Sequence, residues 1–193
     1  MSAIIGIYYR NGRPVSERPV QDMLAKLSHR GPDGASAWSD GPAALGHLMF
    51  KTTPESMNER LPLEDRAASL VLTADARIDN RDELIPQLFD QRSEASLISD
   101  SEIILAGYKK WGQDCAAKFV GDFAFAIWDA KNRTIFCARD HFGLKPFYYF
   151  LSENVFAFAT EIKALFWLPE VPRRLNELKV ADFLAGIDDD KEI

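Results

Sequence analysis

Apolar residues along this chain fall into short strand-like runs and longer helix-like stripes. Runs rich in β-branched and aromatic residues, bounded by turn residues, predict strands. They cover residues 3–9, 43–50, 70–73 and four further runs between 120 and 158. Breaks at 132–133, 143–146 and 152–154 separate the last four runs, whose close succession predicts an antiparallel meander. The order of elements lacks the strand–helix–strand alternation of a parallel sheet.

Apolar residues three and four positions apart predict helices elsewhere in the chain. Asn80 can cap one of these helices. Ser99, with Glu102 three residues later, has the pattern of a capping box at the start of another. Gly31 and Pro32 end the first helix and predict a loop. The predicted helices cover residues 20–27, 80–88, 99–111, 162–167 and 180–184.

The composition is that of a soluble globular protein with one large domain. Of 193 residues, 47% are hydrophobic and 27% are charged, and the formal net charge is −6. Basic residues are scattered, which argues against a nucleic-acid partner, and the apolar runs are too short to cross a membrane. Cys115 and Cys137 are too few for a disulfide framework and too isolated for a metal site. We therefore expect a cytoplasmic protein with no metal, nucleic-acid or membrane partner.

The C-terminal residues have the composition of a linker. Residues 186–193 are acidic and contain no capping element. We expect a domain over residues 1–180, followed at 181–193 by the start of a linker toward a further domain.

Five short motifs, in a fixed order, resemble the N-terminal class II glutamine amidotransferase domain of asparagine synthetases. The resemblance runs from Met1 to about Leu168 and implies the fold of the N-terminal-nucleophile hydrolases. That fold is α+β, a four-layer αββα sandwich in which two antiparallel sheets pack between helices, with Ser2 at the start of a central strand. The motifs are Arg30-Gly31-Pro32-Asp33, Ile78-Asp79-Asn80, Ser99-Asp100-Ser101-Glu102, Gly121-Asp122-Phe123-Ala124-Phe125-Ala126 and the run from Arg139 to Tyr149.

The resemblance also implies a partner domain. Enzymes of this family are ligases of asparagine biosynthesis, in which the N-terminal domain releases ammonia from glutamine and a C-terminal synthetase domain uses ATP and Mg²⁺. The sequence contains no pyrophosphate-binding loop of the synthetase type. We expect the ligase step, with its ATP and Mg²⁺, to belong to a synthetase domain of the same polypeptide, and this chain to hold no cofactor. A homodimer is left open.

The nucleophile position differs from the family. Its members have a cysteine as second residue, which becomes the N-terminal nucleophile once the initiator methionine is removed. This chain has Ser2 there. Serine is a weaker nucleophile than cysteine at neutral pH because almost none of it is ionised. We interpret Ser2 as a vestige of the nucleophile.

Other positions of the family's site have changed as well. The family forms its oxyanion hole from an Asn-Gly pair, and the matching residues here are Asp75 and Ala76. A carboxylate would repel a developing oxyanion. Met49 stands in place of the arginine that holds the glutamine carboxylate, and a thioether cannot form that ion pair. Arg77 and Asp100 match substrate-binding positions, with Asp100 in the place of the aspartate that receives the amino group. Asp100 could equally cap its helix.

Three hypotheses follow. The leading one is a glutaminase-inactive, structural domain of an asparagine synthetase homologue, catalytically inactive on its own. A domain of this kind resembles those of β-lactam synthetases and lasso peptide cyclases, which lack the cysteine because their nitrogen comes from an amine within the substrate. The second is a serine N-terminal-nucleophile amidohydrolase, for which Met49 and Asp75 suit a less anionic amide than glutamine. The third is a free-standing interaction domain that presents residues 120–158 to a partner.

Overall fold

Two antiparallel sheets form the centre of the molecule. The computed structural model describes residues 1–90 and 98–186. One sheet has five strands in the order β2-β3-β1-β9-β8, and the other has four in the order β4-β5-β6-β7. The first sheet consists of β1 (Ala3–Tyr9), β2 (Ala35–Asp40), β3 (Ala43–Leu48), β8 (Tyr148–Leu151) and β9 (Val155–Ala159). The second consists of β4 (Leu63–Asp65), β5 (Leu70–Ile78), β6 (Gly121–Asp129) and β7 (Thr134–Arg139).

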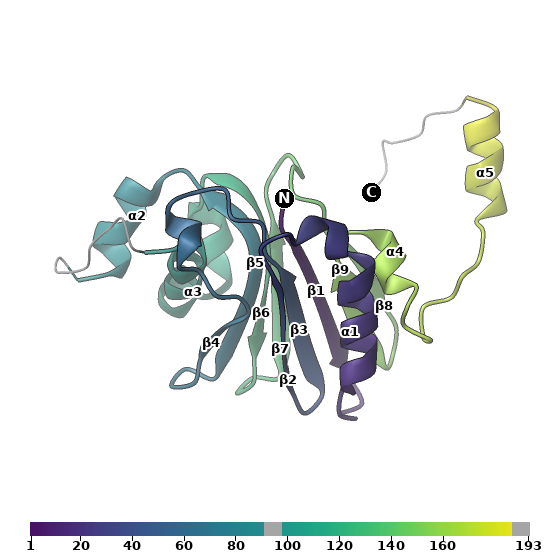
Figure 1. The fold of residues 1–193 in the computed structure, drawn as a ribbon, viewed down its shortest axis with the longest axis horizontal. Coiled ribbons are helices and arrows are strands. Elements are labelled where there is room, and N and C mark those ends of the chain that lie inside the picture. Colours follow the sequence, from purple (N-terminus) through teal and green to yellow (C-terminus); the bar gives the residue numbers. More distant parts are fainter. Residues whose placement is uncertain (91–97, 187–193) are drawn as a thin grey trace.

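Helices cover the outer faces of the two sheets (Figure 1). The first sheet carries α1 (Glu17–Lys26) and α4 (Ile162–Leu165), and the second carries α2 (Arg81–Leu88) and α3 (Asp100–Trp111). A further helix, α5 (Glu177–Leu184), stands apart from the sandwich in Figure 1, and Leu178, Phe183 and Leu184 on it are exposed. Short 3₁₀ turns occur at Ser28–Arg30, Glu55–Met57 and Gly112–Lys118.

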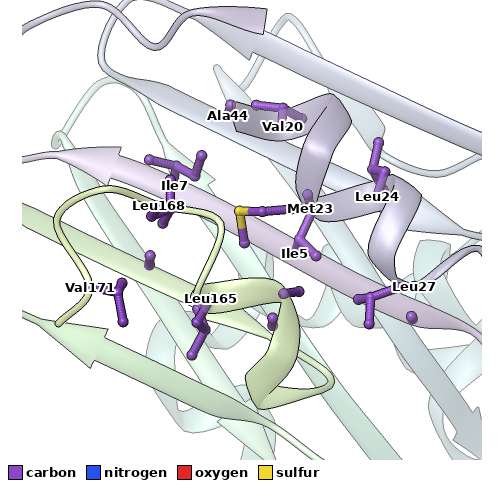
Figure 2. Close-up of a cluster of buried hydrophobic side chains, with 14 of the residues drawn as sticks. Ile5, Ile7, Val20, Met23, Leu24, Leu27, Ala44, Leu165, Leu168 and Val171 are labelled. Atoms are coloured by element: carbon purple, nitrogen blue, oxygen red, sulfur yellow. The ribbon is translucent and has the colours of Figure 1, made fainter. Parts of the chain in front are cut away.

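Three apolar layers hold the four structural layers together. The layer between the sheets contains Ile4, Val71 and Phe158. Figure 2 shows the layer between the first sheet and its helices, in which Met23 of α1 lies against Ile5 and Ile7 of β1. The layer between the second sheet and α2 and α3 is dominated by the aromatic side chains of β6 and by Ile103 and Ile104. The predicted αββα sandwich is therefore confirmed, with β1 as the central strand of its sheet.

The predicted meander over residues 120–158 is wrong in one respect. The four strands exist, but β6 and β7 pair in one sheet while β8 and β9 pair in the other. The reason lies in long-range pairing, because β9 aligns with the central strand β1, Ile5 opposite Ala159. The connection over residues 140–147 crosses between the sheets rather than forming a tight hairpin.

Strands β2 and β4 were not predicted, and β5 is longer than predicted. β5 continues to Ile78, well beyond the predicted end at residue 73. β2 and β4 lie at sheet edges, and their polar sequences, largely exposed in β2 and partly exposed in β4, carry little strand signal.

The two predicted helix caps have different outcomes. The capping box is confirmed, since the Ser99 hydroxyl accepts from the Glu102 N–H at 3.2 Å and the Glu102 carboxylate accepts from the Ser99 N–H at 2.7 Å. Asn80 precedes α2, but its side chain does not cap it. Its amide donates to the Lys118 carbonyl and accepts from the Val120 N–H, each at 3.0 Å. A tertiary contact has replaced the local one.

The expected domain boundary at 180–181 falls within α5, and the acidic tail from residue 187 lies outside the described residues. The two-part organisation stays a prediction. Within the described part of the chain, no helix has the length and apolarity that a membrane crossing demands.

Candidate functional site

All six predicted site residues line one pocket of about 190 Å³ at the start of β1. The pocket lies where the beginning of β1, the segment after β3 and the second half of β5 meet. The six residues are Ser2, Met49, Asp75, Ala76, Arg77 and Asp100.

Ser2 is buried directly before the central strand. Its hydroxyl oxygen accepts from the Phe50 N–H at 3.0 Å and lies 3.4 Å from the Phe50 carbonyl oxygen, to which it can donate. Both hydrogen-bonding roles of the hydroxyl are thus directed at the backbone after β3. This arrangement ties the start of β1 to the pocket wall.

Asp75 and Lys145 form a buried ion pair in the pocket. The Lys145 ammonium donates to Asp75 Oδ1 at 2.8 Å, and the two side chains are 14% and 8% exposed. The second oxygen of Asp75, Oδ2, is buried and has no hydrogen-bond partner among the described residues. A buried charge is tolerated when it is paired, so Lys145 makes the carboxylate on β5 possible.

A structured loop positions Lys145. The carboxylate of Asp140 accepts from the backbone N–H groups of Phe142, Leu144 and Lys145 at 2.9–3.1 Å. Burial raises the pKa of Asp140, but the three bonds and the nearby Arg139 together outweigh burial, so the pKa is lowered overall. Gly143 sits at φ +64°, a conformation that disfavours other residues. The Arg139–Tyr149 motif therefore builds a hydrogen-bonded crossing between the sheets.

The loop after α1 supports Met49. The Met49 N–H donates to the Gly34 carbonyl at 2.8 Å, and the Asp33 carboxylate accepts from the Lys51 N–H at 2.8 Å. A Cβ on Gly31 would lie 2.7 Å from the Leu48 Cβ, so only glycine allows this close approach. Met49 is consequently held in the wall with only 8% of its surface exposed.

Asp100 is anchored by protein groups and does not cap its helix. Ser99 is the cap, and Asp100 is the first helical residue. Its carboxylate accepts from the Ile78 N–H at 3.2 Å and pairs with Arg81. Burial raises the pKa of Asp100, opposed by Arg81.

Ala76 does not form a turn in the pocket wall, and Arg77 does not offer an unpaired cation to it. Ala76 lies within β5 opposite Phe123, in extended backbone. Arg77 makes two bonds to Asp79, at 2.8 and 3.1 Å.

Sequence reasoning missed several pocket residues. Lys145 belongs to a motif quoted above, but its partner is 70 positions away in the sequence. Glu59 lies in a polar loop without any pattern, and it accepts from the backbone N–H of Ser101 at 3.2 Å and from its hydroxyl. Burial raises the pKa of Glu59. Glu55 and Asp122 complete the acidic lining.

In residues 1–90 and 98–186, no group of three or more histidine, cysteine, aspartate or glutamate side chains is arranged to hold a metal ion.

The αββα sandwich, with a pocket at the start of its central strand, defines the fold class of the N-terminal-nucleophile hydrolases. Solved structures share this fold. One is the glutamine phosphoribosylpyrophosphate amidotransferase from B. subtilis complexed with ADP and GMP, at TM-score 0.67 and 21% identity over 84% of this chain and 42% of that one. A second, described as the allosteric regulatory enzyme of purine biosynthesis, has TM-score 0.68 at 21% identity over 86% of this chain and 43% of that one. At this identity the likeness establishes the fold alone.

Residues 1–192 match the family described as glutamine amidotransferase domain. The chain belongs to this family. It is 31% identical to a putative glutamine-hydrolysing asparagine synthetase 2 of Methanocaldococcus jannaschii over 91% of this chain, and 29% identical to glutamine-hydrolysing asparagine synthetase 3 of Bacillus subtilis (strain 168) over 89%. The matched region spans 37% and 28% of the lengths of these two relatives.

Proposed function

We propose that this chain is the amidotransferase-like domain of an asparagine synthetase homologue, that it does not hydrolyse glutamine, and that it serves as a structural support for an ATP-dependent, amide-forming synthetase domain. The family membership supports the first part. The pocket chemistry supports the second. The short coverage of the two synthetases supports the third, because most of their length lies outside the matched region.

The buried Asp75–Lys145 pair beside Ser2 carries the proposal. Glutamine hydrolysis passes through an oxyanion that needs hydrogen-bond donors. Asp75 presents acceptor oxygens at the position where the family has the asparagine donor. Loss of a single oxyanion-hole donor typically raises the barrier by about 3 kcal/mol. The carboxylate in its place has its charge paired with Lys145, but it still supplies an acceptor where a donor is needed.

Two further features of the pocket oppose glutamine hydrolysis. Met49 supplies no charge for the substrate carboxylate, and the cations nearby are directed at Asp75 and Asp79. The Ser2 hydroxyl is engaged by the Phe50 backbone. The nucleophile, the oxyanion stabilisation and the carboxylate binding are therefore all weakened. Because catalytic groups of this kind act as a unit, we expect the loss of several of them to abolish glutamine hydrolysis.

Ammonia release from L-glutamine by the purified chain tests this proposal. We expect no release above a blank without protein, and no difference between the wild type and Ser2→Ala. Mass spectrometry of the N-terminus accompanies the assay, because a Ser2 nucleophile requires removal of Met1. Turnover of glutamine that disappears in Ser2→Ala would overturn the proposal. Turnover of a different amide with the same Ser2 dependence would establish the serine amidohydrolase instead.

A further inference from the structure

We propose that the pocket around Asp75 is a binding site for a small organic cation, a primary ammonium or guanidinium compound. The inference rests on the proposed function in one respect, namely that the pocket has lost glutamine as its ligand. It goes beyond that function by assigning the pocket a cationic ligand in place of the zwitterion glutamine.

The first argument is the charge of the lining. Of the described residues that form the pocket wall, five bear a carboxylate and two bear a permanent side-chain cation. Both cations already face a carboxylate, Lys145 facing Asp75 and Arg77 facing Asp79. Arg81, which is not part of the wall, pairs with Asp100, and Met1, which bears the N-terminal ammonium, lies on the wall. No side-chain cation is paired with Glu55, Glu59 or Asp122 among the described ion pairs, so the remaining negative charge favours a ligand cation over a ligand carboxylate. The carboxylate residues are Glu55, Glu59, Asp75, Asp100 and Asp122.

The second, independent argument is the incomplete bonding of Asp75. Its side chain is more than nine-tenths buried, and Oδ2 has no partner within the described part of the chain, while Lys145 serves Oδ1 alone. A buried carboxylate with one donor leaves most of its acceptor capacity unused, which is costly in a desolvated place. A ligand with several N–H groups can supply the missing donors. Because Oδ2 is covered by its surroundings, binding includes a shift of the flexible Lys145 side chain.

The size of the pocket limits the ligand. A volume of about 190 Å³ is below the roughly 300–1,000 Å³ of pockets for drug-sized molecules. Met49 contributes an apolar, polarizable wall suited to a short aliphatic chain. A cationic head beside Asp75 and a short alkyl stem against Met49 match these features.

Titration of the isotope-labelled chain by NMR tests the inference. The probes are butylammonium and propylguanidinium, with butyrate as the size-matched anion and L-glutamine as a separate arm. We expect saturable shifts of the Asp75, Ala76 and Phe50 amide signals with the cations and none with butyrate. Whichever of the two cations binds more tightly identifies the preferred head group.

Variants locate the site. Asp75→Asn should weaken cation binding at least tenfold, and Met49→Arg should do the same without touching the ion pair. Asp65→Asn is the matched control, because Asp65 pairs with Lys109 away from this pocket. If Asp75→Asn fails to fold, the Met49→Arg variant and the comparison of cation with anion binding to the wild type still show whether the cation binds in this pocket.

The outcomes separate the inference from the proposed function. Equal binding of butyrate and butylammonium, unchanged binding in Asp75→Asn and Met49→Arg, or no cation binding would overturn the cation site. None of these results bears on glutamine hydrolysis. Saturable binding of L-glutamine at the same signals, together with ammonia release, would overturn both.

Discussion

Individual buried polar residues define what this pocket and its surroundings can do. Asp75 and Lys145 face each other across 70 positions of sequence, and each accounts for the burial of the other. His47 on β3 is the opposite case. It is 1% exposed, and neither ring nitrogen has a partner among the described residues. Burial lowers the pKa of His47 to about 3.

A buried neutral histidine makes stability depend on pH. Because the unfolded side chain titrates near 6.5, His47 binds one more proton in the unfolded chain than in the folded chain between about pH 6.5 and 3. The stabilisation from neutral His47 is complete above about pH 6.5 and is lost as pH falls, at about 1.4 kcal/mol per pH unit. Urea unfolding of His47→Leu between pH 7 and 4 should therefore show a shallower loss of stability than the wild type.

His141→Gln is the control for this prediction, because His141 is exposed. Its pH profile should follow that of the wild type. A His47→Leu profile as steep as that of the wild type would show that His47 is not the group being protonated on unfolding.

At the scale of elements, local signals were readable in the sequence and long-range pairings were not. The capping box at Ser99 is encoded within four residues and was predicted. The side chain of Asn80 bonds to Lys118 and Val120, so the prediction that it caps its helix is wrong. The assignment of β8 and β9 to the other sheet depends on pairing with β1, about 150 residues earlier in the chain. Periodicity reports which face is apolar, but it carries no information about the partner strand.

The loop that joins β7 to β8 gives a prediction at this scale. Asp140→Asn removes the charge from an acceptor of three backbone N–H groups. Hydrogen bonds to charged groups contribute about 1.5–3 kcal/mol, so we expect a loss of about 2 kcal/mol in the free energy of unfolding by urea. Asp22→Asn changes a half-exposed carboxylate on α1 whose ion partner Arg18 is 3.8 Å away, and it should change the free energy of unfolding by less than about 0.5 kcal/mol. Equal effects of the two substitutions would contradict a structural role for Asp140.

At the scale of the whole molecule, the sandwich and the location of its pocket follow from the family motifs. The six site positions were predicted from the resemblance, and the structure gathers them around one pocket. The ion partner of Asp75 and the surrounding carboxylates were not predicted, because they come from separate segments that only the tertiary fold brings together. The chain thus combines the architecture of a glutamine amidotransferase domain with a pocket that contains the Asp75–Lys145 ion pair.

Restoration of the residues that the family has at these positions tests most directly the proposal that the pocket does not bind glutamine. A glutamine-like electrophile is offered to Ser2→Cys alone and to Ser2→Cys combined with Met49→Arg, Asp75→Asn and Ala76→Gly. Covalent labelling of position 2 is then measured by mass spectrometry, with removal of Met1 verified in both. One restored group gains little while the others are absent. The account predicts labelling of the quadruple variant and little or none of the single one. Equal labelling of both would contradict it, because the pocket would then bind glutamine without the restored residues.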